Sequence, residues 1–104
     1  MKFKVVVSAE ARSQINDLGR WWRRNREKDP TRFRDELRRV SSLLARDPYI
    51  GVLVEDAGIE GLRRHPLQKT PYLVYYVPFP EQGVISIEAV WSGVKQEGPP
   101  LPRR

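Results

Sequence analysis

The chain of 104 residues contains no cysteine and a single histidine, His65. Without cysteine there is no disulfide, no thiolate nucleophile and no cysteine-based metal site. A lone imidazole does not supply the ligands of a structural zinc site. We therefore expect a protein that needs no metal or cofactor and works in the reducing cytoplasm.

Long apolar runs are also missing. The N-terminal stretch "MKFKVVVSAEA" holds only three consecutive valines, too few for the core of a signal peptide or for a membrane span. Glycine-rich phosphate-binding motifs and the HExxH zinc motif are absent as well. These absences exclude nucleotide-binding proteins with a glycine-rich phosphate loop and zinc hydrolases with an HExxH motif. They also predict no contact with a membrane.

Positive charge is what the chain has in excess, with a formal net charge of +6 and an isoelectric point near 10.1. Residues 1–46 hold 13 Lys and Arg against 6 Asp and Glu, net +7, whereas residues 47–104 hold 6 against 7, net −1. A strongly basic first half can attract nucleic acid, the ribosome or an acidic protein segment. It is equally consistent with a solvated helix surface that keeps the protein soluble.

The first residues predict a strand followed by a helix. Residues 2–8 alternate at first and then become β-branched, as in a strand. Ser8 can cap the following helix, whose apolar positions recur at i, i+4, i+7 and i+11. These positions are Ala11, Ile15, Leu18 and Trp22. Trp21 lies about 100° away from this stripe.

A second helix is predicted after Asp29-Pro30, which we interpret as a cap followed by proline at the first helical position. The helix should end at Asp47-Pro48. Its apolar positions repeat the spacing of the first helix and are Phe33, Leu37, Val40 and Leu44. The short connection between the two helices predicts an antiparallel hairpin.

The second half predicts a loop and three strands. Residues 49–61 are rich in glycine and without a clear period, so we expect a loop. Residues 62–68 are irregular and contain Pro66, which is typical of a short or edge strand. Residues 71–79 and 83–91 are strongly β-forming and are joined by a turn.

The element order βααβββ predicts an α+β fold, with the helical hairpin packed on one face of a small, mostly antiparallel sheet. Alternation in the last strand predicts one set of side chains toward the helices and a more open face with Ser86 and Glu88. The set expected toward the helices is Ile85, Ile87, Ala89 and Trp91. We expect a single domain over residues 1–101 and a short basic tail over residues 102–104.

Three segments together resemble one protein family: "FRDELRRVSSLLARDPYIGVLVE", "GLRRHPLQKTPYLVYYV" and "ISIEAVWSGVKQEGPPL". They combine an arginine-bearing strand, a threonine–aromatic turn, a "YYV" strand, and a strand that closes in Ala-Val-Trp before a proline-ended tail. This order resembles the RelE/ParE superfamily, the toxic halves of bacterial toxin–antitoxin pairs, over about residues 4–101. The ParE-like, plasmid-stabilisation branch is the nearer match.

The resemblance implies a choice between two activities. RelE-like members cut messenger RNA in the ribosome, whereas ParE-like members are understood to poison DNA gyrase and have no known hydrolytic site. The ribonuclease branch uses two lysines, a strand arginine, and a C-terminal arginine and tyrosine. The corresponding positions here are Arg63, His65, Tyr72, Lys95 and Leu101. No tyrosine follows Tyr76, so the ribonuclease set is incomplete and gyrase is favoured as the target.

A ribonuclease would have to rely on Arg63, His65 and Lys95. His65 would be the base, because histidine changes its protonation most readily near neutral pH; the alternative is a partly exposed residue on an edge strand. Arg63 and Arg64 point to opposite faces of their strand. We expect one of them to line the open face and Arg64 to have the positioning role.

The residues expected to contact the target are Arg63, Arg64, Lys69, Tyr72 and Lys95. Lys95 can bind a phosphate as a point charge. Three tyrosines lie on the predicted strand over residues 71–79: Tyr72, Tyr75 and Tyr76. They either stack bases or form core and cross-strand pairs, and the second interpretation is favoured.

Trp21 lies off the apolar stripe among arginines. Such a residue is typical of an interface anchor or of a ring lying under arginine side chains. The resemblance implies a cognate ParD-like antitoxin whose C-terminal segment folds onto the toxin, and an acidic amphipathic segment suits a hairpin of net +7. The expected contacts in this hetero-oligomer are Trp21, Arg20, Arg24, Arg34 and Arg38.

Three classes of function therefore remain. The first is a binding toxin that traps DNA gyrase. The second is a ribosome-dependent endoribonuclease. The third is a basic binding protein without toxicity, since family likeness alone does not establish an activity.

Overall fold

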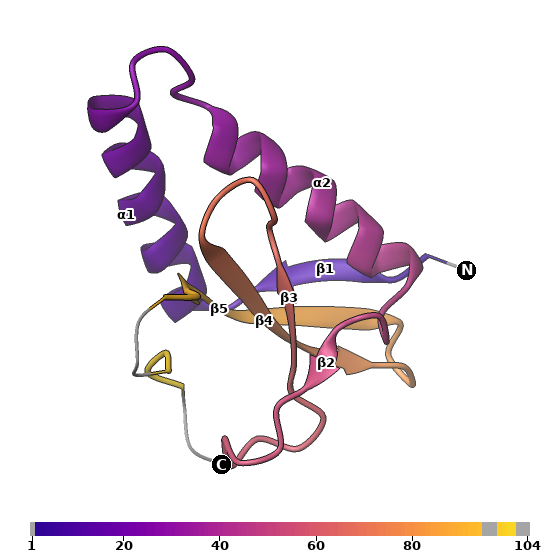
Figure 1. Ribbon diagram of the computed structural model, residues 1–104. Coiled ribbons are helices and arrows are strands. Elements are labelled where there is room, and N and C mark those ends of the chain that lie inside the picture. The colour runs from indigo at the N-terminus through magenta and orange to yellow at the C-terminus, as the bar shows by residue number, and fades with distance from the viewer. Residues whose placement is uncertain (1, 95–97, 102–104) are drawn as a thin grey trace.

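A computed structural model of the chain describes residues 2–94 and 98–101, with two helices on one side of a five-stranded sheet (Figure 1). The elements are β1 (Lys4–Val7), α1 (Ala9–Asn25), α2 (Arg32–Arg46), β2 (Val52–Leu53), β3 (Arg63–Pro66), β4 (Tyr72–Phe79) and β5 (Val84–Ser92). The strand order is β1-β5-β4-β3-β2, with β1 parallel to β5 and the other pairs antiparallel. The predicted α+β class, with a hairpin on a mostly antiparallel sheet, is confirmed.

The first helix has the predicted start and buried face. The Ser8 hydroxyl oxygen accepts a hydrogen bond from the Ala11 N–H at 3.1 Å, which satisfies one of the donors left open at a helix start. Ala11 and Trp22 are buried at the two ends of the predicted stripe, and Ile15 and Leu18 pack between them. No helix of the described residues combines the length and the apolar character needed to cross a bilayer.

The second helix starts later than predicted. Thr31, not Asp29, is its N-cap residue, and Pro30 precedes the helix. The Asp29 carbonyl accepts a hydrogen bond from the Arg32 N–H at 3.3 Å, and the Asp29 carboxylate accepts one from Arg32 Nε at 2.6 Å. These bonds close a turn before the helix, so the prediction for this cap is wrong. The predicted end at Asp47 is confirmed.

A strand that the sequence does not reveal forms in the expected loop. Val52 and Leu53 pair with β3, with Val52 opposite Arg64 and Leu53 opposite Arg63. Two residues carry no readable period, so the sequence does not indicate β2. The strand β3 is short, as predicted, but it is not the outermost strand, because β2 lies beside its first two residues.

A bulge changes which side chains of β5 face the helices. Tyr75 lies opposite Ala89 whereas Tyr76 lies opposite Ile87, so Glu88 is the extra residue. The extra residue reverses the alternation, and Ala89 and Trp91 therefore lie on the face away from the helices. The helix-facing residues are Ile85, Ile87 and Val90, which corrects the predicted set for Ala89 and Trp91.

The sheet has a core on each face. The helix-side core includes the largest buried side chains, among them Phe33, Leu44 and Tyr76. The far face is covered by its own apolar cluster around Ile59, Leu62, Tyr75, Val77 and Ala89, against which Leu101 packs. The expectation of a more open face is therefore wrong for most of this side, and even Glu88 is buried.

Candidate functional site

The two arginines of β3 have opposite surroundings. Arg63 donates from Nη1 to the carbonyl oxygens of Tyr49 and Gly51, at 3.1 and 2.7 Å. Its guanidinium carbon also lies 5.2 Å from the centre of the Tyr49 ring, a cation–π contact. Arg63 is thus the arginine with the positioning role, which corrects the assignment of that role to Arg64.

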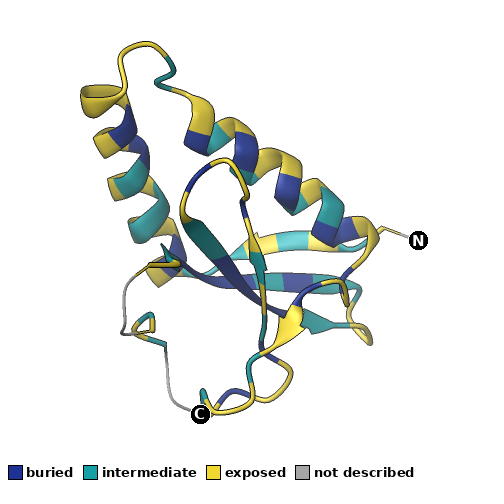
Figure 2. Cartoon of the chain, viewed as in Figure 1, coloured by how far each residue is buried: buried dark blue, intermediate teal, exposed yellow. Residues whose placement is uncertain are grey.

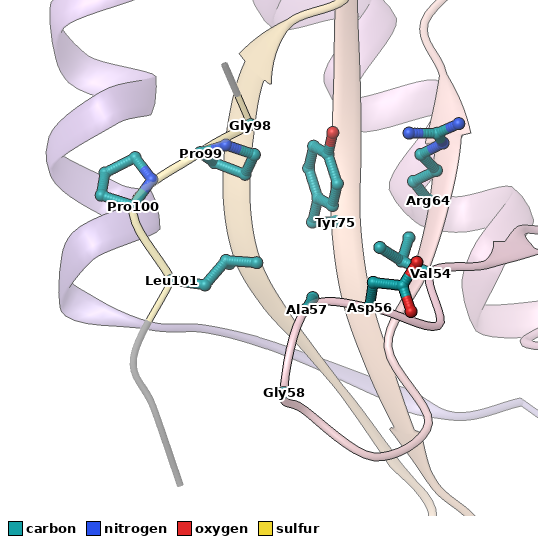
Figure 3. Close-up of a pocket in the computed structure, with 10 residues that line it drawn as sticks. All are labelled: Val54, Asp56, Ala57, Gly58, Arg64, Tyr75, Gly98, Pro99, Pro100 and Leu101. Atoms are coloured by element: carbon teal, nitrogen blue, oxygen red, sulfur yellow. The ribbon is translucent and has the colours of Figure 1, made fainter.

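Arg64 points to the far face of the sheet and lines an open pocket of about 660 Å³ (Figure 3). Tyr75 on the neighbouring strand lies next to it, since the two residues are paired in register. The loop after β2 contributes Asp56, and the C-terminal segment 98–101 closes the opposite side. The pocket therefore presents a cation, a carboxylate and a phenol above an apolar floor.

Among the described residues expected at the target surface, Arg64 alone lines this pocket. Tyr75 is almost fully buried, as favoured for the tyrosines, but it borders the pocket. The sequence names Tyr75 as a candidate, but its position beside Arg64 depends on a strand register that the sequence does not give. Asp56 lies in a loop without periodicity, so no pattern pointed to it.

Tyr76 has a structural role on the helix side. Its hydroxyl oxygen accepts a hydrogen bond from the Gly51 N–H at 2.9 Å. Burial raises the pKa of the Tyr76 hydroxyl above its ordinary value, although the bond from Gly51 and the charge of Arg63 oppose this rise. The core interpretation of Tyr75 and Tyr76 is confirmed by their burial.

His65 lies opposite Val74 and is partly exposed. Its Nδ1 atom is 2.8 Å from the carbonyl oxygen of Pro66. Because a carbonyl oxygen only accepts, His65 must donate this hydrogen bond through a proton on Nδ1. No other functional side chain is brought to His65 by the contacts of the described residues.

Lys69 and Tyr72 lie on the helix side, away from the Arg64 pocket. The Lys69 N–H and the Thr70 hydroxyl donate to the buried Glu36 carboxylate at 2.6 and 2.7 Å, which ties their loop to α2. The Tyr72 hydroxyl accepts from Trp22 Nε1 at 3.1 Å. The four described residues of the five expected at the target surface therefore do not form one cluster. Lys95 lies outside the described residues.

The residues expected to bind an antitoxin lie on the hairpin. Trp21 is 40% exposed, with the Arg26 guanidinium carbon 5.1 Å from its ring centre, so it is both an exposed ring and part of a cation–π cluster. Arg20 forms an ion pair with Asp17, and Arg38 forms one with Asp35 at 3.4 Å. These exposed pairs contribute little to stability.

Arg34 differs from the other arginines of the hairpin because it lies between the helices. A Cβ atom at Gly19 would be only 2.6 Å from Arg34 Nε, so the guanidinium lies directly on the glycine backbone. Arg34 Nε is buried and has no hydrogen-bond partner within the described part of the chain. Arg24, in contrast, is exposed in the last turn of α1.

The described residues do not gather a metal site. Among them, no group of three His, Asp or Glu side chains is placed to hold an ion. The described surface includes a basic hairpin, a far-face pocket and an exposed strand at the edge of the sheet.

Two helices on a mixed five-stranded sheet, with the hairpin preceding the main strands, form the architecture of the RelE/ParE-like toxins. The sequence model described as ParE toxin of type II toxin–antitoxin system, parDE, matches residues 5–97. The chain therefore belongs to the ParE toxin family. A toxin of such a pair has an antitoxin as its partner. No curated protein matches the chain.

Proposed function

We propose that this chain is a toxin that arrests growth by binding DNA gyrase in the cytoplasm, without cutting RNA. Its activity is blocked when a cognate ParD-like antitoxin covers the helical hairpin. The observation that supports a binding mechanism is that both described ribonuclease candidates, Arg63 and His65, are engaged by backbone carbonyl oxygens. Cleavage at a ribose hydroxyl requires a base, an acid and a phosphate clamp close together.

Arg63 and His65 lie on the same face of β3, and each is held by a backbone carbonyl. Arg63 is directed at the carbonyl oxygens of Tyr49 and Gly51, which restrains the guanidinium that a phosphate would need. His65 is held by the Pro66 carbonyl. Arg64, the cation that does line a pocket, is on the opposite face of the same strand from Arg63 and His65.

The antitoxin surface is supported by charge and by the exposure of Trp21. Residues 1–46 carry a net charge of +7, most of it on the two helices. An acidic amphipathic segment would gain both from this charge and from burying the Trp21 ring. Trp21 also lines a mainly apolar hollow beside α1, together with Leu18 and Tyr72.

The test is induced expression with and without a neighbouring antitoxin gene. We expect growth arrest by the toxin alone, rescue by co-expression, loss of gyrase supercoiling activity in the presence of the purified toxin, and unchanged messenger RNA decay. Accelerated, ribosome-dependent RNA decay with normal supercoiling would favour the ribonuclease alternative. Normal growth at high soluble expression would favour the third class, a basic binding protein without toxicity.

A further inference from the structure

Four large apolar side chains are exposed within five residues at the outer strand of the sheet. Tyr49, Ile50, Val52 and Leu53, which we call the edge strip, are between 43% and 66% exposed. Figure 2 shows β2 as an exposed strand at the margin of the fold. A cluster of this kind is unusual on a surface that has no partner.

The backbone that carries the edge strip is held from inside. Gly51 donates its N–H to the buried Tyr76 hydroxyl, and its carbonyl accepts from Arg63. A Cβ at Gly51 would lie 2.6 Å from the Tyr76 hydroxyl oxygen and 2.8 Å from the Arg64 carbonyl oxygen, so only glycine fits there. The apolar side chains are thus displayed on a fixed backbone, which lowers the entropy that a partner must overcome.

The geometry of β2 also offers backbone groups for pairing. β2 is the last strand in the sheet order, and the Val54 N–H donates to the Leu62 carbonyl at 2.9 Å. Because neighbouring residues of an antiparallel ladder alternate in direction, the N–H and C=O of Leu53 point away from β3. Edge strands are usually guarded by charge or proline, and neither occurs between residues 49 and 54.

The charges near the edge strip specify the ends of a partner segment. Residues 47–61 contain four carboxylates and no Lys or Arg, and these acids are exposed: Asp47, Glu55, Asp56 and Glu60. The neighbouring bases are Arg46, Arg63 and Arg64, of which Arg63 is engaged by the Tyr49 and Gly51 carbonyls and by the Tyr49 ring. The rim of the strip therefore favours basic groups, in contrast to the hairpin.

A second copy of the chain does not fit these observations. The exposed halves of these four side chains together have a surface area of roughly a few hundred Å². This is well below the ~800 Å² that each partner buries in a stable interface. A single extended segment needs less area, because backbone hydrogen bonds add to the side-chain contacts. The acidic antitoxin segment would meet acids at both ends of the strip.

We propose that the edge strip is where the toxin docks its protein target, by adding an extended segment with alternating apolar residues and basic ends beside β2. This inference rests on the proposed binding mechanism. It assigns the target and the antitoxin to different surfaces of the toxin, which are of opposite charge.

The first test uses synthetic peptides and does not depend on toxicity. The probe is a short peptide of alternating valine and threonine with two lysines at each end, and the matched probe carries glutamates in place of the lysines. We expect the lysine peptide to bind the purified toxin at least about tenfold more tightly than the glutamate peptide, by fluorescence anisotropy. Equal binding, or no binding of either, would overturn the proposal.

The second test uses variants of the full chain. Leu53→Lys should lower lysine-peptide affinity about tenfold or more and reduce growth arrest, while antitoxin affinity and the melting temperature stay unchanged. Glu55→Lys, on the exposed rim, should weaken binding of the lysine peptide and strengthen binding of the glutamate peptide, without altering the apolar residues of the edge strip. Val94→Lys is the matched control, because Val94 is 81% exposed and lies outside the strip.

The two tests separate the failure of this inference from failure of the proposed function. A wild-type chain that binds the lysine peptide but does not arrest growth would contradict the function and leave the docking surface standing. A toxic Leu53→Lys variant that has lost the peptide would contradict the assignment of the strip to the target. A dimer that dissociates in the Leu53→Lys variant would show that a second copy is the occupant.

Discussion

The helical hairpin and the edge strip present opposite kinds of surface. On the hairpin, exposed arginines stand one turn from acids, as in the pairs Arg20–Asp17 and Arg38–Asp35. These charges are solvated and adjustable, and only Trp21 adds a large exposed ring. In the edge strip the side chains are apolar and the backbone is fixed through Gly51. The comparison teaches that a chain of 104 residues has room for two binding surfaces with little shared chemistry.

Both surfaces depend on β5, so removing its end should have the largest effect. Val90 donates its N–H to Gln14 Oε1 of α1 at 2.9 Å, and Trp91 packs in the far-face cluster. Truncation before Trp91 should abolish the cooperative thermal transition, whereas removal of residues 102–104 alone should leave it unchanged. Equal melting curves for the two truncations would show that the last strand is not needed for the fold.

Gly51→Ala should disturb the edge strip and leave the hairpin intact. The new Cβ would be forced against the Tyr76 hydroxyl, and we expect a loss of about 2–3 kcal/mol in the free energy of unfolding, measured by urea denaturation. Antitoxin affinity of the folded variant should be unchanged. Gly93→Ala is the control, because its added Cβ would meet its nearest neighbour at an ordinary 3.5 Å. An equal loss in both variants would mean that the close approach at Gly51 is unimportant.

Trp21→Ala should act on the hairpin alone. We expect the antitoxin to bind about tenfold more weakly by calorimetry, since an exposed tryptophan is a typical interface anchor, with less than about 1 kcal/mol change in stability. Arg38→Ala removes an exposed cation paired with Asp35 and should change the affinity less than about threefold. The assignment of Trp21 is contradicted if Arg38→Ala has the larger effect.

The smallest effect is expected at His65. If the toxin binds gyrase, His65→Ala should leave growth arrest nearly intact because no proton is transferred, whereas Lys95→Ala, which removes one of the cations expected to contact the target, should attenuate it. A ribonuclease using His65 as its base would lose about a hundredfold or more in cleavage rate. A folded His65→Ala variant that binds antitoxin and is harmless would therefore overturn the choice of gyrase.

The parts of the fold that the sequence predicts are those with local causes. The Ser8 cap and the stripe from Ala11 to Trp22 depend on residues close in sequence, and both are confirmed. The bulge at Glu88 and the strand β2 depend on partners far along the chain, which no local pattern contains.

The same limit applies to the candidate site. The sequence identifies Arg63 and Arg64 as a pair on opposite faces but not which of them meets the Tyr49 and Gly51 carbonyls. Strand register decides that Tyr75, and not Tyr72, stands beside Arg64. Residue type therefore suggested the chemistry, and pairing determined where it lies.

The parallel pairing of β1 with β5 has a consequence for synthesis of the toxin. Ser8 donates a hydrogen bond from its hydroxyl to the carbonyl of Glu88, 80 residues further along the chain. At ~5–20 residues per second, the N-terminal strand leaves the ribosome many seconds before its partner exists. Because contacts of such large sequence separation also form slowly, the sheet closes only after β5 has been synthesised. If the antitoxin covers the hairpin, as proposed, the cell that makes the toxin has a delay in which an antitoxin already present can bind the hairpin first.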